Sequence, residues 1–135
     1  MDLSNLISNI HWLPVVVLTL FSFVIGFIWH SKFLFGNSWK QENNPNDIPI
    51  KINAPLIFGG TALVHFIAIV GLSAIVSGKG GVYGLIAGIL ISLVWVLPAM
   101  GGTYLFANRS LKLLAIDAGM YLVLFSLSGT VLGIW

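Results

Sequence analysis

Four long apolar blocks constrain the fold of this chain more than any other feature of its sequence. They cover roughly residues 11–30, 53–77, 81–107 and 111–135. An α-helix needs about 20 mostly apolar residues to cross the hydrocarbon core of a bilayer, so each block is long enough. The blocks are continuously apolar and do not alternate with polar residues, which favours helices over a β-barrel. We therefore predict an all-α integral membrane protein with four transmembrane helices in a compact bundle.

The composition supports this prediction. Hydrophobic residues make up 58% of the 135 residues and charged residues 7%, whereas a soluble domain carries about 25% charged residues. Too few charges are present to cover a surface in water. The four helices use nearly the whole chain, so we predict one domain over residues 1–135, with a water-exposed loop at about 31–52. Residues 1–10 could lie in the membrane interface or extend the first helix.

The distribution of charged residues indicates how the protein is oriented in the membrane, and the small net charge gives no indication of a nucleic-acid partner. The first and third connections between helices carry five basic residues and the second carries one: Lys32, Lys40, Lys51, Arg109 and Lys112 against Lys79. By the positive-inside rule, the first and third connections are expected in the cytoplasm and both termini outside. A net charge of +2 is too small to indicate nucleic-acid binding, and the absence of cysteine excludes disulfides and thiolate chemistry.

Small residues recur at helical spacing in three of the blocks. Such stripes mark places where membrane helices approach closely. The third block has Gly84, Gly88, Ser92, Trp95, Ala99 and Gly102, and the fourth has Ala115, Gly119, Leu122, Ser126, Gly129 and Gly133. Gly26 lies on a similar stripe in the first block. We expect these glycines to pack helices together, and we expect Pro98 to kink the third helix.

Asp117 is the one carboxylate inside the fourth block. A charge at the centre of a membrane span costs roughly 2.5–3.5 kcal/mol on insertion scales, so it normally faces protein or a water-filled cavity. Asp117 points about 200° away from Ala115 and Gly119, so it lies nearly opposite the small-residue stripe. Both faces of this helix therefore need partners. Four helices offer little interior, and for this reason we expect a homo-oligomer.

The depth of Asp117 suggests which side chains it meets. It lies about seven residues, or roughly 10 Å, past the start of its helix, and N–H or O–H donors lie about one turn nearer the cytoplasm on other helices. His65, in the middle of the second block, is a further intramembrane polar group. The candidate polar site comprises Asp117, His65, His30, Trp29, Tyr104 and Tyr121. Two interpretations stay open: hydrogen bonds that only tie helices together, or a proton or cation site.

The segment "WHSKFLFGNSWK", from Trp29 to Lys40, interleaves aromatic residues with lysines. Such segments are typical of the aromatic belt at a membrane surface, with lysines that snorkel to the water. The alternative is a short re-entrant or interfacial elbow that shapes a binding site. We expect the aromatic belt.

Two stretches resemble a known family. "GFIWHSKFLFGNSWKQ" and "RSLKLLAIDAGMYLVLFSLSGTVLGIW" are similar to the opening and closing motifs of a bacterial family of small membrane proteins, domain of unknown function seventeen sixty-one. The resemblance covers nearly the whole chain. The chain departs from the family pattern in two places. His30-Ser31-Lys32 stands where the family pattern has Tyr-Ser-Pro, and Met120-Tyr121 stands where it has an aromatic residue followed by His. The resemblance implies four helices in the bacterial cytoplasmic membrane and no particular activity.

Three classes of function fit these observations. The first, which we expect, is a non-catalytic scaffold or accessory subunit that packs against membrane lipid, copies of itself or a larger membrane complex. The second is an oligomeric transporter or channel with Asp117 as a proton or cation site. The third is an enzyme acting on lipid or quinone, but the sequence has no nucleophile–base pair, metal cluster or phosphate loop. We therefore predict no catalytic residue, metal or cofactor.

Overall fold

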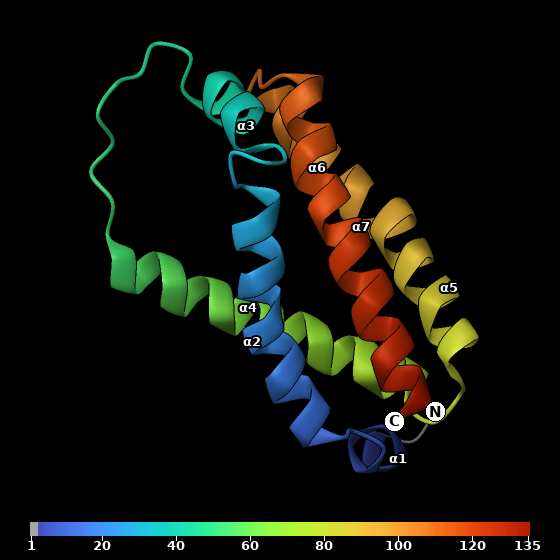
Figure 1. The fold of residues 1–135 in the computed structure, drawn as a ribbon. Coiled ribbons are helices and arrows are strands. Elements are labelled where there is room, and N and C mark those ends of the chain that lie inside the picture. The colour runs from blue at the N-terminus through green and yellow to red at the C-terminus, as the bar shows by residue number, and fades with distance from the viewer. Residues whose placement is uncertain (1–2) are drawn as a thin grey trace.

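The computed structural model describes residues 3–135, which form helices and connecting segments (Figure 1). The elements are α1 (Leu3–Ser8), α2 (Trp12–Trp29), α3 (Gly36–Asn43), α4 (Ala54–Val76), α5 (Gly81–Ile91), the π-helix η1 (Ser92–Val96), α6 (Leu97–Phe106) and α7 (Leu111–Ile134). In the described part of the chain, four stretches are long and apolar enough to cross a membrane: α2, α4, α7 and the continuous stretch Gly81–Phe106. The predicted all-helical fold with four spans is confirmed, and the homo-oligomer stays a prediction.

Side-chain caps set the beginnings of two long helices. The Asn53 side chain accepts a hydrogen bond from the Leu56 amide at 3.2 Å, and Ser110 Oγ accepts one from the Leu113 amide at 3.1 Å. Each cap satisfies an amide that has no partner within its own helix. At the N-terminus, α1 is a separate short helix and does not extend α2, while residues 1 and 2 lie outside the described residues.

The antiparallel pair α5 and α7 is the closest helix contact in the fold. A Cβ atom on Gly84 would overlap the Gly129 carbonyl, and one on Gly88 would overlap the Phe125 carbonyl. At the end of the pair, the Gly80 amide donates a hydrogen bond to the Gly133 carbonyl at 2.9 Å. These glycines allow the two backbones to touch, as small residues do at membrane helix interfaces. The contact lies within one chain.

The π-helix η1 redirects the third span. Ser92, buried at its start, donates to the carbonyls of Gly88 at 2.8 Å and Tyr121 at 3.2 Å. The predicted stripe ends there, because Trp95 is 65% exposed and a Cβ on Gly102 would meet no atom within 4 Å. Within the described residues Gly102 has no neighbour at this distance, and packing of Gly102 against a helix of another copy stays a prediction. The wide turn of a π-helix shifts the register of every residue that follows it.

The same register shift turns Tyr104 towards α7. In a regular α-helix, Tyr104 would point about 120° away from Ser92, because each residue turns by about 100°. One extra residue in a π-turn removes about 100° of this difference and leaves about 20°. Pro98, two residues after the end of η1, cannot donate a hydrogen bond to the carbonyl four residues before it. The irregularity expected at Pro98 thus takes the form of a π-turn.

Helix α7 lies at the centre of the fold, between α5 on one side and α2 and α4 on the other (Figure 1). Seven buried side chains from α2, α4 and α7 form the main hydrophobic core: Val15, Leu18, Ile69, Leu72, Val76, Phe125 and Leu132. Both faces of α7 are therefore covered within one chain. Asp117 finds its protein environment without a second copy.

Helix α4 runs across α2 and departs from the compact bundle that we predicted (Figure 1). Its buried residues, His65 to Val76, all lie in its C-terminal half. In its N-terminal half, Leu56 is 69% exposed, and Cβ atoms on Gly59 and Gly60 would meet nothing within 4 Å. The first half of α4 thus diverges from α2 but keeps a contact with it at Phe58, whose ring centroid lies 6.2 Å from that of Phe23.

Candidate functional site

Asp117 on α7 lies among three potential hydrogen-bond donors from three other parts of the chain. Its Oδ1 accepts a hydrogen bond from Trp39 Nε1 at 2.9 Å, and its Oδ2 accepts one from the Tyr104 hydroxyl. His30 Nε2 lies 3.7 Å from Oδ1. The side chain of Asp117 is 18% exposed. Hydrogen bonds to the charged form favour the carboxylate, so this arrangement explains how a carboxyl group is accommodated inside a membrane span.

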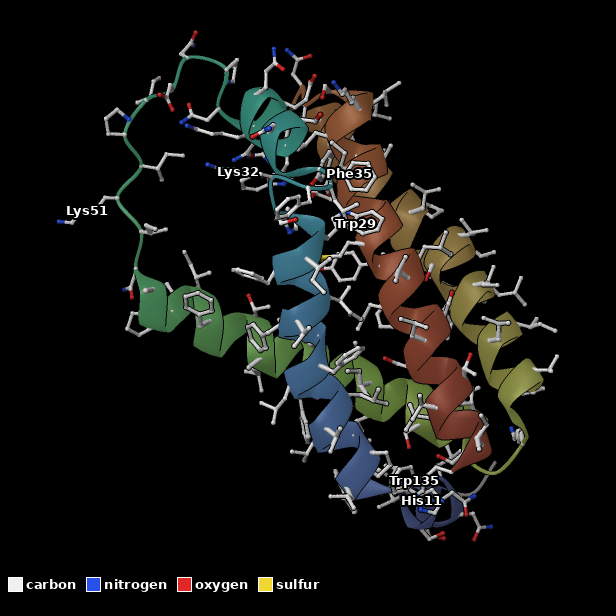
Figure 2. All side chains as sticks on the ribbon, in the orientation of Figure 1. His11, Trp29, Lys32, Phe35, Lys51 and Trp135 are labelled. Carbon is white, nitrogen blue, oxygen red and sulfur yellow. The ribbon has the colours of Figure 1, made fainter. Side chains whose placement is uncertain are left out.

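An elbow between α2 and α3 brings Trp39 to this position. The Phe35 amide donates to the Trp29 carbonyl at 3.1 Å, and the Gly36 amide donates to the Ser31 carbonyl at 2.9 Å. The rings of Trp29 and Phe35 pack with their centroids 4.6 Å apart, as Figure 2 shows. A Cβ on Gly36 would overlap the His30 carbonyl, so the tight turn requires glycine. The segment therefore forms the elbow that we set aside in favour of an aromatic belt.

Trp39 is not among the site residues predicted from the sequence. The residue lies 78 positions before Asp117 and belongs to a segment that reads locally as an interface belt. The alternative interpretation of that segment, as an elbow that shapes a binding site, would have included Trp39 in the site. Only the fold shows which of its aromatic residues turns back to the acid.

Polar contacts also hold α3 against the connection between α6 and α7. Arg109 Nη1 donates to Asn43 Oδ1 at 3.1 Å, and Lys112 Nζ lies 3.7 Å from Glu42 Oε1. These pairs are exposed or half-exposed, so each contributes little energy by itself. Together with Trp39 they place α3 across the end of the bundle nearest to Asp117 (Figure 1).

Trp29 lies near the acid but bonds elsewhere. Its Nε1 donates to the Ile116 carbonyl at 2.8 Å, and its ring lies against Gly119, where a Cβ would be 3.0 Å from Trp29 Cζ2. Gly119 therefore makes room for this ring. Gly26 has more space, because a Cβ there would be 3.8 Å from the Met120 sulfur. Trp29 fixes α2 against α7 beside the site.

His30, just beyond the end of α2, is oriented to form a charge pair with Asp117. Its Nδ1 donates to the Gly26 carbonyl at 2.9 Å, which directs Nε2 towards the carboxylate. The Asp117 carboxylate, 3.7 Å from Nε2, raises the pKa of His30 above 6.5, with help from the Gly26 carbonyl, while burial opposes the change. Protonated His30 would compensate the charge of Asp117.

His65 forms a second polar group on α4, away from the Asp117 carboxylate. Ser22 Oγ donates its single proton to the Thr19 carbonyl at 2.6 Å. The contact of 2.7 Å between Ser22 Oγ and His65 Nδ1 therefore requires Nδ1 to be the donor. In the neutral ring this leaves Nε2 as an acceptor. The edge-to-face contact with Tyr121, 5.8 Å between centroids, places His65 beside the α7 turn that follows Asp117.

A cavity of about 820 Å³ connects these groups. Its walls come from α2, α3, α4, α6 and α7, and most of its lining side chains are apolar or aromatic. Of the candidate polar residues, Asp117, His30, Tyr104, His65 and Tyr121 line it, together with Trp39. A mostly apolar cavity with a few convergent polar groups is the usual form of a small-molecule site. Among the described residues, no group of three or more His, Asp or Glu is placed to hold a metal ion.

The four candidate membrane spans, with an acid on the fourth, indicate a class: a multi-pass membrane protein with a hydrogen-bonded carboxyl group inside the protein. Within that class, the chain belongs to the DUF1761 family, described as a protein of unknown function, whose family model matches residues 13–133. No curated protein and no solved structure matches the chain.

Proposed function

We propose that this protein is a non-enzymatic membrane protein that binds a small solute or ion at Asp117, as a transporter or channel subunit does. One observation carries the proposal: a cavity of about 820 Å³ reaches a carboxylate that lies within a membrane span. A purely structural acid has no need of such a space beside it. Intramembrane acids that line cavities commonly serve ion and solute pathways.

The scaffold role that the sequence favours has weaker support. It depends on small-residue stripes that are free to meet a partner. Gly84, Gly88 and Gly129 instead lie in the contact between α5 and α7 of one chain. Assembly into a homo-oligomer or with a larger membrane complex stays a prediction, and any such interface would have to use other surfaces.

We also propose the bacterial cytoplasmic membrane as the location, with both termini outside. The support is the charge difference between the connections, with five basic residues against one. Because the chain has no cysteine, Asn44→Cys and Ser77→Cys can be labelled singly with an impermeant maleimide in intact cells. Labelling at Ser77→Cys with protection at Asn44→Cys is expected, and the reverse pattern would overturn the orientation.

Modification of Asp117 by dicyclohexylcarbodiimide tests the binding role. This apolar reagent reacts with protonated carboxyl groups that it reaches from the membrane. We expect mass spectrometry to find the adduct at Asp117, formed faster as the pH falls, with little adduct at the exposed Asp47. A folded protein in which Asp117 stays unmodified at every pH would show that the acid is a sealed structural link.

A further inference from the structure

The size of the cavity at Asp117 indicates more than an ion site. A volume of about 820 Å³ falls in the range of roughly 300–1,000 Å³ that holds small organic molecules. An inorganic ion or a proton would leave most of this space unused. The lining beyond Asp117 is mostly apolar and includes Phe27, Phe58 and Met100, so most of the wall offers such an ion no ligand. The occupant should therefore have an apolar body.

The charges that line the cavity favour a cationic occupant. Among the described residues of the lining, Asp117 is the one carboxylate, no Lys or Arg is present, and His30 can offset the acid only when it is protonated. With neutral His30, the lining carries a single negative charge. Asp117 accepts two hydrogen bonds, whereas a carboxylate has about four lone-pair positions. It can therefore receive a further donor or cation. Trp39 beside it has an aromatic ring of the kind that attracts organic cations, whereas the Tyr104 ring already has the Arg109 guanidinium over it at 5.8 Å.

The cavity is lined in part by residues of α2 and of the first half of α4. Two phenylalanines of this lining are largely exposed, Phe27 at 81% and Phe58 at 61%, so we place the opening of the cavity between these two helices. Both belong to the candidate membrane spans, so in a bilayer the opening faces lipid. A molecule dissolved in the membrane reaches the cavity without crossing the connections at either end.

We infer that the cavity takes an amphipathic organic cation from the lipid, with its positive group beside Asp117 and its apolar body between α2 and α4. The inference rests on the proposed function, because it names the class of solute for the same site. In this arrangement the body of the ligand passes His65, whose Nε2 accepts a hydrogen bond from any donor that the ligand carries there.

Binding of two probes of nearly equal size and opposite charge tests this inference. Tetraphenylphosphonium is an apolar cation, and tetraphenylborate is an anion of similar shape. With the full chain in lipid nanodiscs, and empty nanodiscs to correct for partition, we expect saturable binding of the cation near one per chain. We expect no saturable binding of the anion. Equal binding of both ions, or binding of neither, would overturn the inference.

Matched variants locate the bound cation. Asp117→Asn keeps the side-chain volume and removes the charge, and should weaken cation binding by about tenfold or more. Asp47→Asn makes the same chemical change at an exposed acid outside this cavity and should bind like the original chain. Thr61→Trp fills the space between α2 and α4 without touching the acid and should also abolish binding. Unchanged binding in Asp117→Asn and Thr61→Trp would overturn the inference.

The outcomes separate this inference from the proposed function. If carbodiimide modifies Asp117, and Na⁺ protects the acid while organic cations do not, Asp117 is an ion site and the inference of an organic cation is wrong. If carbodiimide does not reach Asp117, both proposals fail together. If crosslinking of Thr61→Cys joins two chains through the cavity, a second copy fills the space and the inference is likewise overturned.

Discussion

The two sides of α7 differ in how closely their helices approach. On one side, glycines bring the backbones of α5 and α7 into contact at Gly84, Gly88 and Gly129. On the other side, α4 crosses α2 and leaves a cavity of about 820 Å³ between aromatic and aliphatic side chains. Backbone contact leaves no room for adjustment, because a side chain added at these glycines would meet backbone carbonyls, which cannot move aside as flexible side chains do. The first side is a rigid frame and the second provides space for a ligand.

The frame also determines the position of the site. The π-turn η1 begins at Ser92, which bonds across to α7, and it turns Tyr104 towards Asp117. The donors Trp39 and His30 come from the open side, at the elbow after α2. Asp117 thus lies where the rigid frame meets the open side. Substitutions in the rigid frame and substitutions on the open side should therefore have different consequences.

The largest effect is expected for Gly88→Leu. A side chain there collides with the Phe125 backbone, so the substitution should cost about 3 kcal/mol or more, or prevent folding. The control Gly60→Leu, on the open side, should change the free energy of unfolding by less than about 0.5 kcal/mol. Unfolding by a denaturing detergent, followed by circular dichroism, measures both. Equal tolerance of the two substitutions would contradict the distinction between frame and open side.

Removal of the acid should have an intermediate effect. Asp117→Leu leaves the Trp39 and Tyr104 donors without a partner and should cost about 1–3 kcal/mol. Asp117→Asn keeps one acceptor oxygen and the volume, so its stability should change little. The same unfolding assay checks this order. A Leu variant as stable as the original chain would show that Asp117 has no buried polar partners.

Trp39→Phe should cost about 1 kcal/mol, because it removes the N–H donor to Asp117 and keeps most of the ring. The matched control is Trp12→Phe, at a ring that stacks on Phe66 far from the acid. In the background of Asp117→Leu, the effect of Trp39→Phe should largely disappear, because its partner is already absent. Additive effects in this double-mutant cycle would contradict a direct bond.

The smallest effect concerns the dependence of stability on pH. The pKa of His30 is raised in the folded protein, so protonated His30 contributes stability below its ordinary pKa of 6.5. That contribution is lost as the pH rises through the raised value. We expect thermal stability to fall across about pH 6–8 in the original chain and to change less in His30→Gln. A pH dependence unaltered by His30→Gln would exclude the charge pair.

Much of the fold could be predicted from the sequence, because membrane spans depend on the length of apolar blocks. The helix Ala54–Val76, for example, lies within one residue at each end of the expected 53–77. The crossing of α4 over α2 was not predictable, since it depends on which side chains fill the space between them. The π-turn at Ser92–Val96 also has no local signature beyond the Pro98 that follows it.

The site was only partly predictable, for a similar reason. Depth along a helix is a local property, and it correctly suggested that His30 and Tyr104 lie near Asp117. Which donor bonds to which acceptor depends on how distant segments pack. Trp29 donates to the Ile116 carbonyl, whereas Trp39 donates to Asp117. The prediction of an aromatic belt did not place Trp39 at the acid.

The most direct test compares single cysteines on the two sides of α7. Thr61→Cys lies in the cavity wall, and Ser92→Cys lies in the frame at a position that is 3% exposed. We predict that a membrane-permeant maleimide modifies Thr61→Cys readily and Ser92→Cys hardly at all. Tetraphenylphosphonium should protect Thr61→Cys, and that protection should vanish in Asp117→Asn. Equal reactivity at the two positions, or no protection by the cation, would contradict a rigid frame beside an open, acid-anchored cavity.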